Sequence, residues 1–261
     1  MENLKNKISE KVQSSIRYVG DLTILFLRTI LWMTTPPFKN ERTFQQAKRV
    51  GIDSFLIVSL VALFTGMILA LQTAYQMQKL SSEIYIANLV AVSLVRELGP
   101  VLTALIVAGR IGAAITAEIG TMNVTEQVDA LKTLSSNPIQ YLVVPRFLSL
   151  ALMLPVLTIF SDLIGILGGF IICVFKLQIG AAMYIRMSID ALAVKDIVTG
   201  LTKTVFFGMI IALVACNEGL NVRGGAEGVG KATTRSVVTS FILIIVSDCF
   251  FTALFYFIFK S

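Results

Sequence analysis

The sequence predicts an all-α integral membrane protein with five transmembrane helices, and three observations lead to this prediction. The 261 residues are 56% hydrophobic and only 15% charged, with a mean hydropathy of +0.81, whereas soluble domains average about 45–50% apolar and about 25% charged residues. Five apolar stretches are each long enough to cross a bilayer, which takes about 20 residues. Fourteen basic residues then fall on the side of the N-terminus and five on the other, which places the N-terminus in the cytoplasm.

Residues 1–50 are expected to form a cytoplasmic segment that ends in an interfacial elbow helix within residues 20–35. The apolar run of that helix, Leu22–Met33, has 12 residues, is interrupted by Arg28 and is followed by a Pro-Pro pair. This run is too short to cross the bilayer, but it suits a helix that lies along the membrane surface. We expect no secretory signal peptide, because no apolar core precedes residue 20 and no small-residue cleavage site follows.

Five segments with few or no charges are the predicted transmembrane helices. The third is long enough to tilt, and Pro155 inside it favours a kink. An odd number of spans puts the two termini on opposite sides of the membrane. The predicted spans are residues 54–78, about 95–117, 147–175, about 197–217 and about 237–259.

Between spans two and three the sequence predicts a short amphipathic helix on the cytoplasmic side. Asn123 can cap its N-terminus, with Glu126 as the third residue of a capping box, and the helix is expected to stop before Pro138. The apolar face could lie on the bilayer surface, or it could dock into a soluble partner together with the polar edge of the helix, and the pattern leaves both open. The apolar residues at helical spacing are Val124, Val128, Leu131 and Leu134.

Arg96 and Glu97 stand where the chain re-enters the bilayer from the outer side. Charges at this depth are costly and are usually paired or functional. The two side chains could anchor the helix at the interface. Alternatively, the Arg96 guanidinium could hold a phosphate or carboxylate headgroup, for which its fork of donors is suited.

Four further charged residues, Arg110, Asp162, Lys203 and Asp248, lie inside the predicted spans. By residue count the two acids are near mid-bilayer, Arg110 is nearer the inside and Lys203 is nearer the outside. Opposite charges could pair within the bundle, or the four groups could form a proton or ion relay. An ion-gradient-driven secondary transporter or channel would depend on these residues, and it is the alternative function class.

The composition argues against several kinds of chemistry. His is absent, and the three cysteines are far apart in apolar stretches, so His-based catalysis and a metal site are not expected. A membrane-embedded lipid enzyme would need nucleophile, base or metal ligands at one depth, which the scattered acids do not offer. The loop Gly225-x4-Gly230-Lys231 imitates a phosphate-binding P-loop, but Ala232 stands where a hydroxyl would hold magnesium. The basic charge is read as membrane topology, and no nucleic-acid partner is expected.

The segment RELGPVLTALIVAGRIGAAITAEIGTMNVTEQVDAL, residues 96–131, closely resembles the signature region of MlaE-type permeases. These are the membrane subunits of ABC transporters that work with MCE proteins in lipid trafficking. The resemblance continues through residues 137–169 and 229–240 and covers roughly residues 45–260. It implies a permease domain over residues 51–261 that follows the N-terminal segment and elbow helix of residues 1–50.

The resemblance also implies the partners and the setting. The family works as a permease homodimer bound to two cytoplasmic ATPase subunits and, outside, to an MCE-protein hexamer, and in some systems a small STAS-domain protein sits on the ATPases. ATP and Mg²⁺ would then be bound by the ATPase, so no cofactor is expected on this chain, and the chain is a transport subunit rather than an enzyme. The expected location is a bacterial inner membrane, with the plastid inner envelope as the second choice.

In this family the loop helix between spans two and three is a coupling helix that seats in a groove of the ATPase. The resemblance assigns this role to residues 118–134, with Glu126, Gln127 and Asp129 as the principal polar contacts. The expected coupling residues are Glu118, Thr121, Met122, Thr125, Glu126, Gln127, Asp129 and Leu131.

The resemblance implies a lipid as cargo, with phospholipid as the default and the maintenance of outer-membrane lipid asymmetry or lipid supply as the purpose. A diacyl lipid calls for an apolar site with a polar rim, which the outer half of span one and the start of span two could supply. Arg96 is expected to hold the headgroup, and Leu71 and Tyr75 to contact tail or glycerol. The expected lipid contacts are Leu71, Tyr75, Gln78, Leu94, Arg96 and Glu97.

Overall fold

The computed structural model describes residues 2–36, 40–78 and 85–258, and all of the regular structure in these ranges is helical. Three short π-helical segments, η2, η3 and η4, interrupt the α-helices of spans two and three. In chain order the elements are α1 (Glu2–Met33), α2 (Asn40–Gln78), α3 (Ile86–Ser93), η2 (Leu94–Leu98), α4 (Gly99–Val107), η3 (Ala108–Gly112), α5 (Ala113–Val124), α6 (Gln127–Thr133), η4 (Ile139–Val143), α7 (Val144–Phe175), α8 (Ala181–Ala191), α9 (Val194–Leu220) and α10 (Gly225–Ile258).

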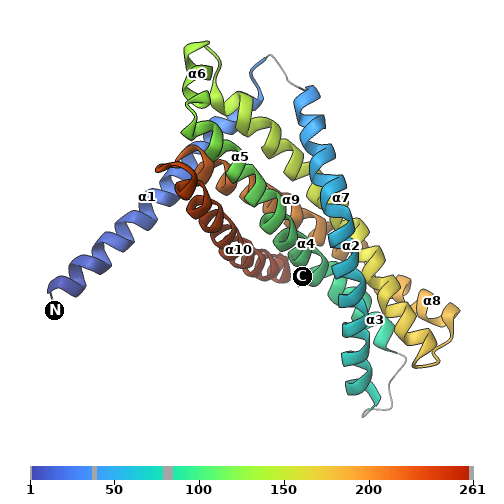
Figure 1. Cartoon of the computed structure of the whole chain (residues 1–261). Coiled ribbons are helices and arrows are strands. Elements are labelled where there is room, and N and C mark those ends of the chain that lie inside the picture. Colours follow the sequence, from blue (N-terminus) through green and yellow to red (C-terminus); the bar gives the residue numbers. More distant parts are fainter. Residues whose placement is uncertain (1, 37–39, 79–84, 259–261) are drawn as a thin grey trace.

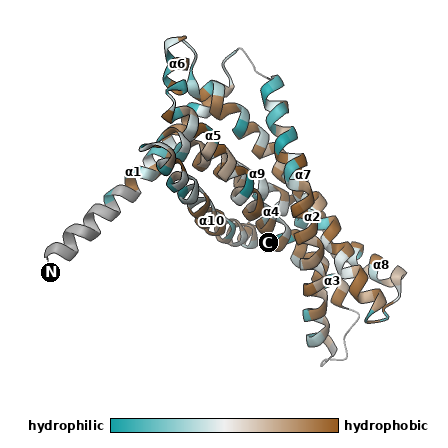
Figure 2. Cartoon of the chain, in the orientation of Figure 1, coloured by the Kyte–Doolittle hydropathy of each residue, from teal (hydrophilic) through white to brown (hydrophobic). Residues whose placement is uncertain are grey.

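Five helices of the described chain are long and apolar enough to cross a membrane, which confirms the predicted all-α fold with five spans. Each is longer than the apolar stretch that predicted it, because the helical backbone continues past the ends of that stretch. Figure 2 shows this distribution, with hydrophobic residues along the middle of the bundle and hydrophilic ones at α6 and at the start of α2. The helices are Glu41–Met77, Ile86–Val124, Ile139–Phe175, Val194–Leu220 and Gly225–Ile258.

The expected elbow helix is the C-terminal part of a longer helix. Helix α1 has 32 residues and extends away from the bundle, so that its N-terminal half lies apart from the other helices (Figure 1). Helix α1 packs on α7, α9 and η4, and Leu25 and Thr29 in its C-terminal half, one helical turn apart, are buried. Nearby, burial and the Glu218 carboxylate raise the pKa of the Tyr18 phenol well above its ordinary value, so this group stays protonated at physiological pH.

The core of the bundle forms where α2 crosses α7 and where α7 packs on α9. Glycines allow the first crossing to be close: a Cβ on Gly66 would lie 1.8 Å from the Gly165 carbonyl oxygen, and a Cβ on Gly168 would lie 2.2 Å from the Leu63 carbonyl oxygen. Small residues let helix backbones approach each other in a membrane, where van der Waals packing drives association. The depth and rotation of α7 against α2 are therefore set by backbone contact.

The loop helix between spans two and three differs from the prediction at its start. Helix α5 continues through Asn123, so Asn123 is not an N-cap, and its side-chain amide instead donates to the Val222 carbonyl at 3.1 Å. The chain breaks at Glu126, which has φ of 58°, and α6 follows as a separate helix of seven residues. The predicted stop before Pro138 is confirmed, with Ser135 at φ of 56°.

Candidate functional site

A cluster of polar side chains lies between spans two, four and five, around the ammonium group of Lys203. The Lys203 Nζ atom is 2.7 Å from Glu97 Oε2, 2.9 Å from Asp248 Oδ1 and 2.7 Å from Thr252 Oγ1. Thr252 in turn donates to Glu97 Oε1 at 3.1 Å. We call Lys203, Glu97, Asp248 and Thr252 the Lys203 cluster.

The elements explain why these groups meet. Glu97 lies in the π-helical segment η2, Lys203 on α9, and Asp248 and Thr252 one turn apart on α10. Lys203 is only 2% exposed, and a buried ammonium is costly unless carboxylates and hydrogen bonds replace its water. Glu97 remains 38% exposed, so the cluster opens to the surface of the chain through this carboxylate.

Four phenylalanines of α9 and α10 form a group that we call the aromatic wall. Three of them, Phe206, Phe251 and Phe255, each follow a residue of the Lys203 cluster by three positions on the same helix, which puts them about one turn away from it. The ring of Phe251 is 4.7 Å from that of Phe206, 5.7 Å from that of Phe250 and 6.0 Å from that of Phe255, measured between centroids. Phe206 and Phe250 are exposed. A charged cluster with one open carboxylate thus stands beside an apolar aromatic surface, which is the combination that an amphiphilic ligand requires.

Arg96 lies next to Glu97 in η2, but it points to a different partner. Its Nε atom is 3.6 Å from Asp196 Oδ1, and its side chain is half exposed. Asp196 sits in the first turn of α9, where its other oxygen accepts a hydrogen bond from the Ala193 amide at 3.1 Å. Arg96 therefore joins span two to the start of span four, and no residue in the described ranges accepts a hydrogen bond from its remaining side-chain donors.

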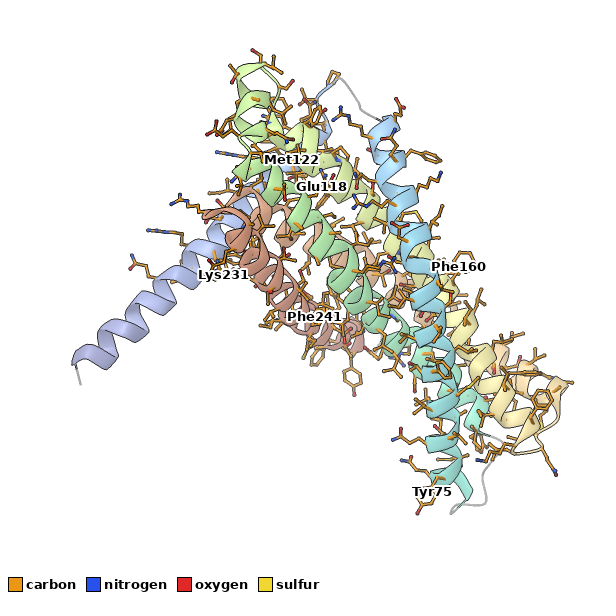
Figure 3. The ribbon with its side chains drawn as sticks, in the orientation of Figure 1. Tyr75, Glu118, Met122, Phe160, Lys231 and Phe241 are labelled. Atoms are coloured by element: carbon orange, nitrogen blue, oxygen red, sulfur yellow. The ribbon has the colours of Figure 1, made fainter. Side chains whose placement is uncertain are left out.

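The other expected lipid contacts do not gather at one place. Leu71 and Tyr75 are exposed on the C-terminal half of α2, and Figure 3 shows Tyr75 near the end of that helix. Leu94 is 2% exposed and packs in the core formed by α2, α3 and α7, so it offers no surface to a lipid here. Gln78 ends α2, and its side chain lies outside the described part of the structure.

The four charged residues predicted inside the spans have different surroundings in the structure. Lys203 and Asp248 form an ion pair, as expected if opposite charges pair within the bundle. Arg110 is exposed in η3 and makes no ion pair with any residue that the structure describes. Asp162 lies against Gly99, where one of its oxygens is buried without a hydrogen-bond partner. A proton relay needs groups in sequence across the membrane, and only two of the four come together.

A second charged cluster lies at the other end of span two, around Glu118. The Glu118 carboxylate is 3.0 Å from Arg49 on α2 and 3.1 Å from Arg146 on α7, and we call these three residues the Glu118 cluster. Arg146 is 5% exposed, so it depends on this carboxylate for neutralisation. Glu118, expected to face a partner, is engaged within the chain.

The remaining expected coupling residues lie on and around α6. Glu126 and Gln127 are exposed at its start, and Asp129 is exposed in its first turn beside Lys132 at 2.7 Å. Thr121 and Thr125 bond their hydroxyls to carbonyls one turn back, while Met122 and Leu131 are half-buried; Figure 3 shows Met122 close to the α6 end of α5 and Glu118 one turn deeper.

The apolar face of α6 is only partly covered by the chain itself. Val128 is 3% exposed, but Leu134 is 76% exposed and Val124 is also exposed. Uncovered apolar groups beside exposed carboxylates at the tip of a helical projection form a surface that a soluble partner could cover.

Sequence reasoning missed three residues of these clusters, Thr252, Arg49 and Arg146, and also missed Asp196, the partner of Arg96. Thr252 could have been found, because it follows Asp248 by four residues and so shares its helix face. Asp196, Arg49 and Arg146 carry no such local signal, since their partners are distant in the chain. Among the described residues no group of three or more Cys, Asp or Glu side chains is placed to hold a metal ion.

A five-span helical bundle that buries ion pairs between its spans and projects a short helix beyond them has the architecture of a transporter's membrane subunit. The model of the family Permease MlaE matches residues 43–254. The chain belongs to the MlaE permease family and is an ABC transporter permease, which implies a separate ATPase subunit.

Relatives in distant organisms agree with this assignment. The chain is 40% identical to a probable ABC transporter permease protein of Rickettsia conorii over 254 residues, which cover 97% of this chain and 98% of the relative. It is 42% identical over 208 residues to one of Synechocystis sp., covering 80% and 79% of the two chains. It is 36% identical over 251 residues to one of Pyropia yezoensis, covering 96% and 94%.

Proposed function

We propose that this permease, as a homodimer in a bacterial inner membrane, moves phospholipid between that membrane and an MCE-protein hexamer on its outer side. The observation that carries the proposal is the Lys203 cluster beside the aromatic wall. A phospholipid has a charged head and long apolar tails, and this part of the chain offers polar groups and apolar rings side by side. Arg96 and Glu97 are the residues for the headgroup.

The two charged clusters suggest how an ATPase drives this movement. Glu97 and Val124 lie on one continuous helix, spaced by 27 residues or about 40 Å. The outer end of this helix is tied to α9 and α10 by the Lys203 cluster, and its inner end is tied to α2 and α7 by the Glu118 cluster. A displacement of α6 by the ATPase would therefore be transmitted along span two to the headgroup residues.

The ATPase contact in this proposal is α6 with its exposed residues Glu126, Gln127 and Asp129. ATP binding closes the two ATPases and draws the two α6 helices together. The homodimer places a second copy against the bundle, and α10 is suited to that contact because only four of its 34 residues are buried within one chain. A STAS-domain protein on the ATPases completes the assembly where it is present.

The first experiment is gentle purification of the permease from its native membrane, followed by mass spectrometry of the proteins and lipids that accompany it. We expect an ATPase subunit, an MCE protein and bound phospholipid. The purified complex is then placed in vesicles with a fluorescent phospholipid, whose ATP-dependent movement should fall at least tenfold in Lys203→Met and stay normal in Lys231→Met. Movement driven by an ion gradient without ATP would overturn the proposal.

A further inference from the structure

A second apolar site lies on the face where α2 and α7 meet, separate from the Lys203 cluster. Here the two helices leave a groove of about 490 Å³, within the about 300–1,000 Å³ of typical small-molecule sites. Figure 3 shows Phe160, which lines the groove, on the opposite side of the bundle from Phe241 of α10. We call it the α2–α7 groove; its principal lining residues are Phe44, Lys48, Ile52, Phe55, Val156 and Phe160.

The groove has one cation and otherwise apolar walls. The lining residues of α2 recur at helical spacing, so the N-terminal part of this helix presents one continuous apolar stripe to α7. Phe55 and Phe160 meet edge to face at 5.4 Å at the end of the groove nearer the bilayer centre. Lys48 lies toward the other end and is the one charged residue among the lining residues described.

Lys48 is exposed, and no residue in the described ranges forms an ion pair or hydrogen bond with it. Its basic neighbours on α2 are engaged: Arg49 pairs with Glu118 at 3.0 Å, and the Arg42 guanidinium stacks 3.5 Å above the Tyr141 ring. The ammonium of Lys48 is therefore the group on this part of α2 that is available to an anion from outside the chain.

The depth of the groove matches that of a lipid in one leaflet. The uncharged part of α2 begins at Ser54, six residues or about 9 Å along the helix from Lys48. Lys48 thus lies at the level of the headgroups, and the groove runs from there into the hydrocarbon region. The distribution of basic residues assigns this side to the cytoplasmic leaflet.

We propose that the α2–α7 groove binds an acyl chain of an anionic phospholipid from the cytoplasmic leaflet, with the Lys48 ammonium on its phosphate. A lone cation at headgroup depth favours a lipid with net negative charge over a zwitterionic one, whose own ammonium competes for the phosphate. The bound chain fills space that α2 and α7 leave open and so stabilises their packing. The inference does not depend on the cargo proposed above, because it requires only that the protein lies in a bilayer.

Native mass spectrometry of the full-length protein, freed of lipid and mixed with phosphatidylglycerol or phosphatidylcholine of equal chain length, tests this. The wild type should bind phosphatidylglycerol about fivefold more tightly, the preference that one basic residue gives near a membrane surface. Lys48→Ala should abolish the preference, while Lys231→Ala, on the same side of the membrane, should keep it. An unchanged preference in Lys48→Ala would overturn the proposal.

A second pair of variants tests the groove itself. Val156→Trp fills it and should lose the bound lipid, whereas Leu163→Trp, exposed on the same helix beyond the groove, should retain it. Val156→Phe serves the same purpose if the larger ring prevents folding. The proposal would be overturned if Val156→Trp and Val156→Phe both retain the lipid. It would also be overturned if these variants keep the lipid but no longer form dimers.

The Lys203→Met protein separates this site from the proposed transport site. It should still bind phosphatidylglycerol in the groove even if its transport is lost. Lipid that disappears in Lys203→Met but remains in Val156→Trp would belong to the Lys203 cluster, and the groove would then be empty of specific lipid.

Discussion

Single residues at the two ends of span two show how the protein keeps charges inside a membrane bundle. Near Glu97, Lys203 of α9 meets two carboxylates and a hydroxyl, and near α6, Glu118 meets two guanidinium groups. In each cluster the most central charge has partners from two other spans. Because an unpaired charge at this depth costs several kcal/mol, each cluster also specifies which helices lie side by side.

Replacing Lys203 by Met should lower the free energy of unfolding by about 3 kcal/mol, because Glu97 and Asp248 then face each other without a cation. Thermal unfolding, followed by the reactivity of the buried Cys173 and Cys216, measures the loss. Lys231→Met is the control and should unfold like the wild type, since Lys231 forms only an exposed pair with Glu227.

Adding Asp248→Asn to Lys203→Met should restore part of this stability, because one of the two opposed carboxylates is removed. A double variant no more stable than Lys203→Met would mean that lost packing, and not charge, explains the effect.

Elements are joined in two contrasting ways, by close backbone contact in the core and by a strained break between α5 and α6. The α2–α7 crossing depends on glycines whose missing side chains admit the opposite backbone. The break between α5 and α6 depends on Glu126, a residue with a side chain held at a positive φ. Such a conformation costs about 1–2 kcal/mol outside glycine, and here it turns α6 away from span two.

Gly66→Ala should separate α2 from α7 and lower the unfolding free energy by about 3 kcal/mol, since its methyl group would overlap the Gly165 carbonyl. The matched control is Gly20→Ala on α1, where no atom lies within 4 Å of the new methyl group and helix propensity improves. Thermal unfolding of both variants tests this prediction. Equal unfolding midpoints for Gly66→Ala and Gly20→Ala would contradict the close crossing of α2 and α7.

Glu126→Gly should keep or raise stability, by about 1 kcal/mol, because glycine adopts a positive φ without strain. Glu126→Val should lower it by a similar amount, since a β-branched residue tolerates this region poorly. Co-purification of the ATPase should fall several-fold in Glu126→Gly if the carboxylate is a polar contact. Full retention of the ATPase would remove Glu126 from the coupling residues while leaving the break itself intact.

At the scale of the whole molecule, the five spans place the α6 projection and the short helix α8 at opposite ends of the bundle (Figure 1). The charge distribution predicts that the α6 end lies in the cytoplasm. The two charged clusters lie near these two ends, so span two is the element that connects them.

Membrane-impermeant maleimide labelling should confirm this orientation in a protein whose exposed Cys249 is first replaced by Ser. Ser135→Cys, after α6, should be labelled at least tenfold faster in inverted membrane vesicles than in intact cells or spheroplasts, and Asp190→Cys on α8 should show the reverse. Both residues are exposed. The same sidedness for both would contradict a single membrane crossing, Ile139–Phe175, between α6 and α8.

The sequence by itself determined that the chain is an all-α membrane protein, how many spans it has and where the loop helix ends. Insertion into a bilayer depends on the length and apolar content of each segment taken alone, and a helix stop such as residues 135–138 is a local signal. The signature of residues 96–131 likewise identifies the family from the order of its residues alone. These properties need no knowledge of which segments are neighbours.

Only the tertiary structure decided which charges meet. Lys203 forms ion pairs with both Glu97 and Asp248, whereas Asp162 and Arg110 form none with the residues that the structure describes. In the structure Leu94 is buried in the core, and Glu118 forms ion pairs within the chain. Helix α5 ends one residue beyond Asn123, the expected N-cap of the next helix. The physical reason is that these contacts depend on the rotation and depth of each helix against its neighbours. Glycine contacts between helices and the π-helical segments of spans two and three set that geometry.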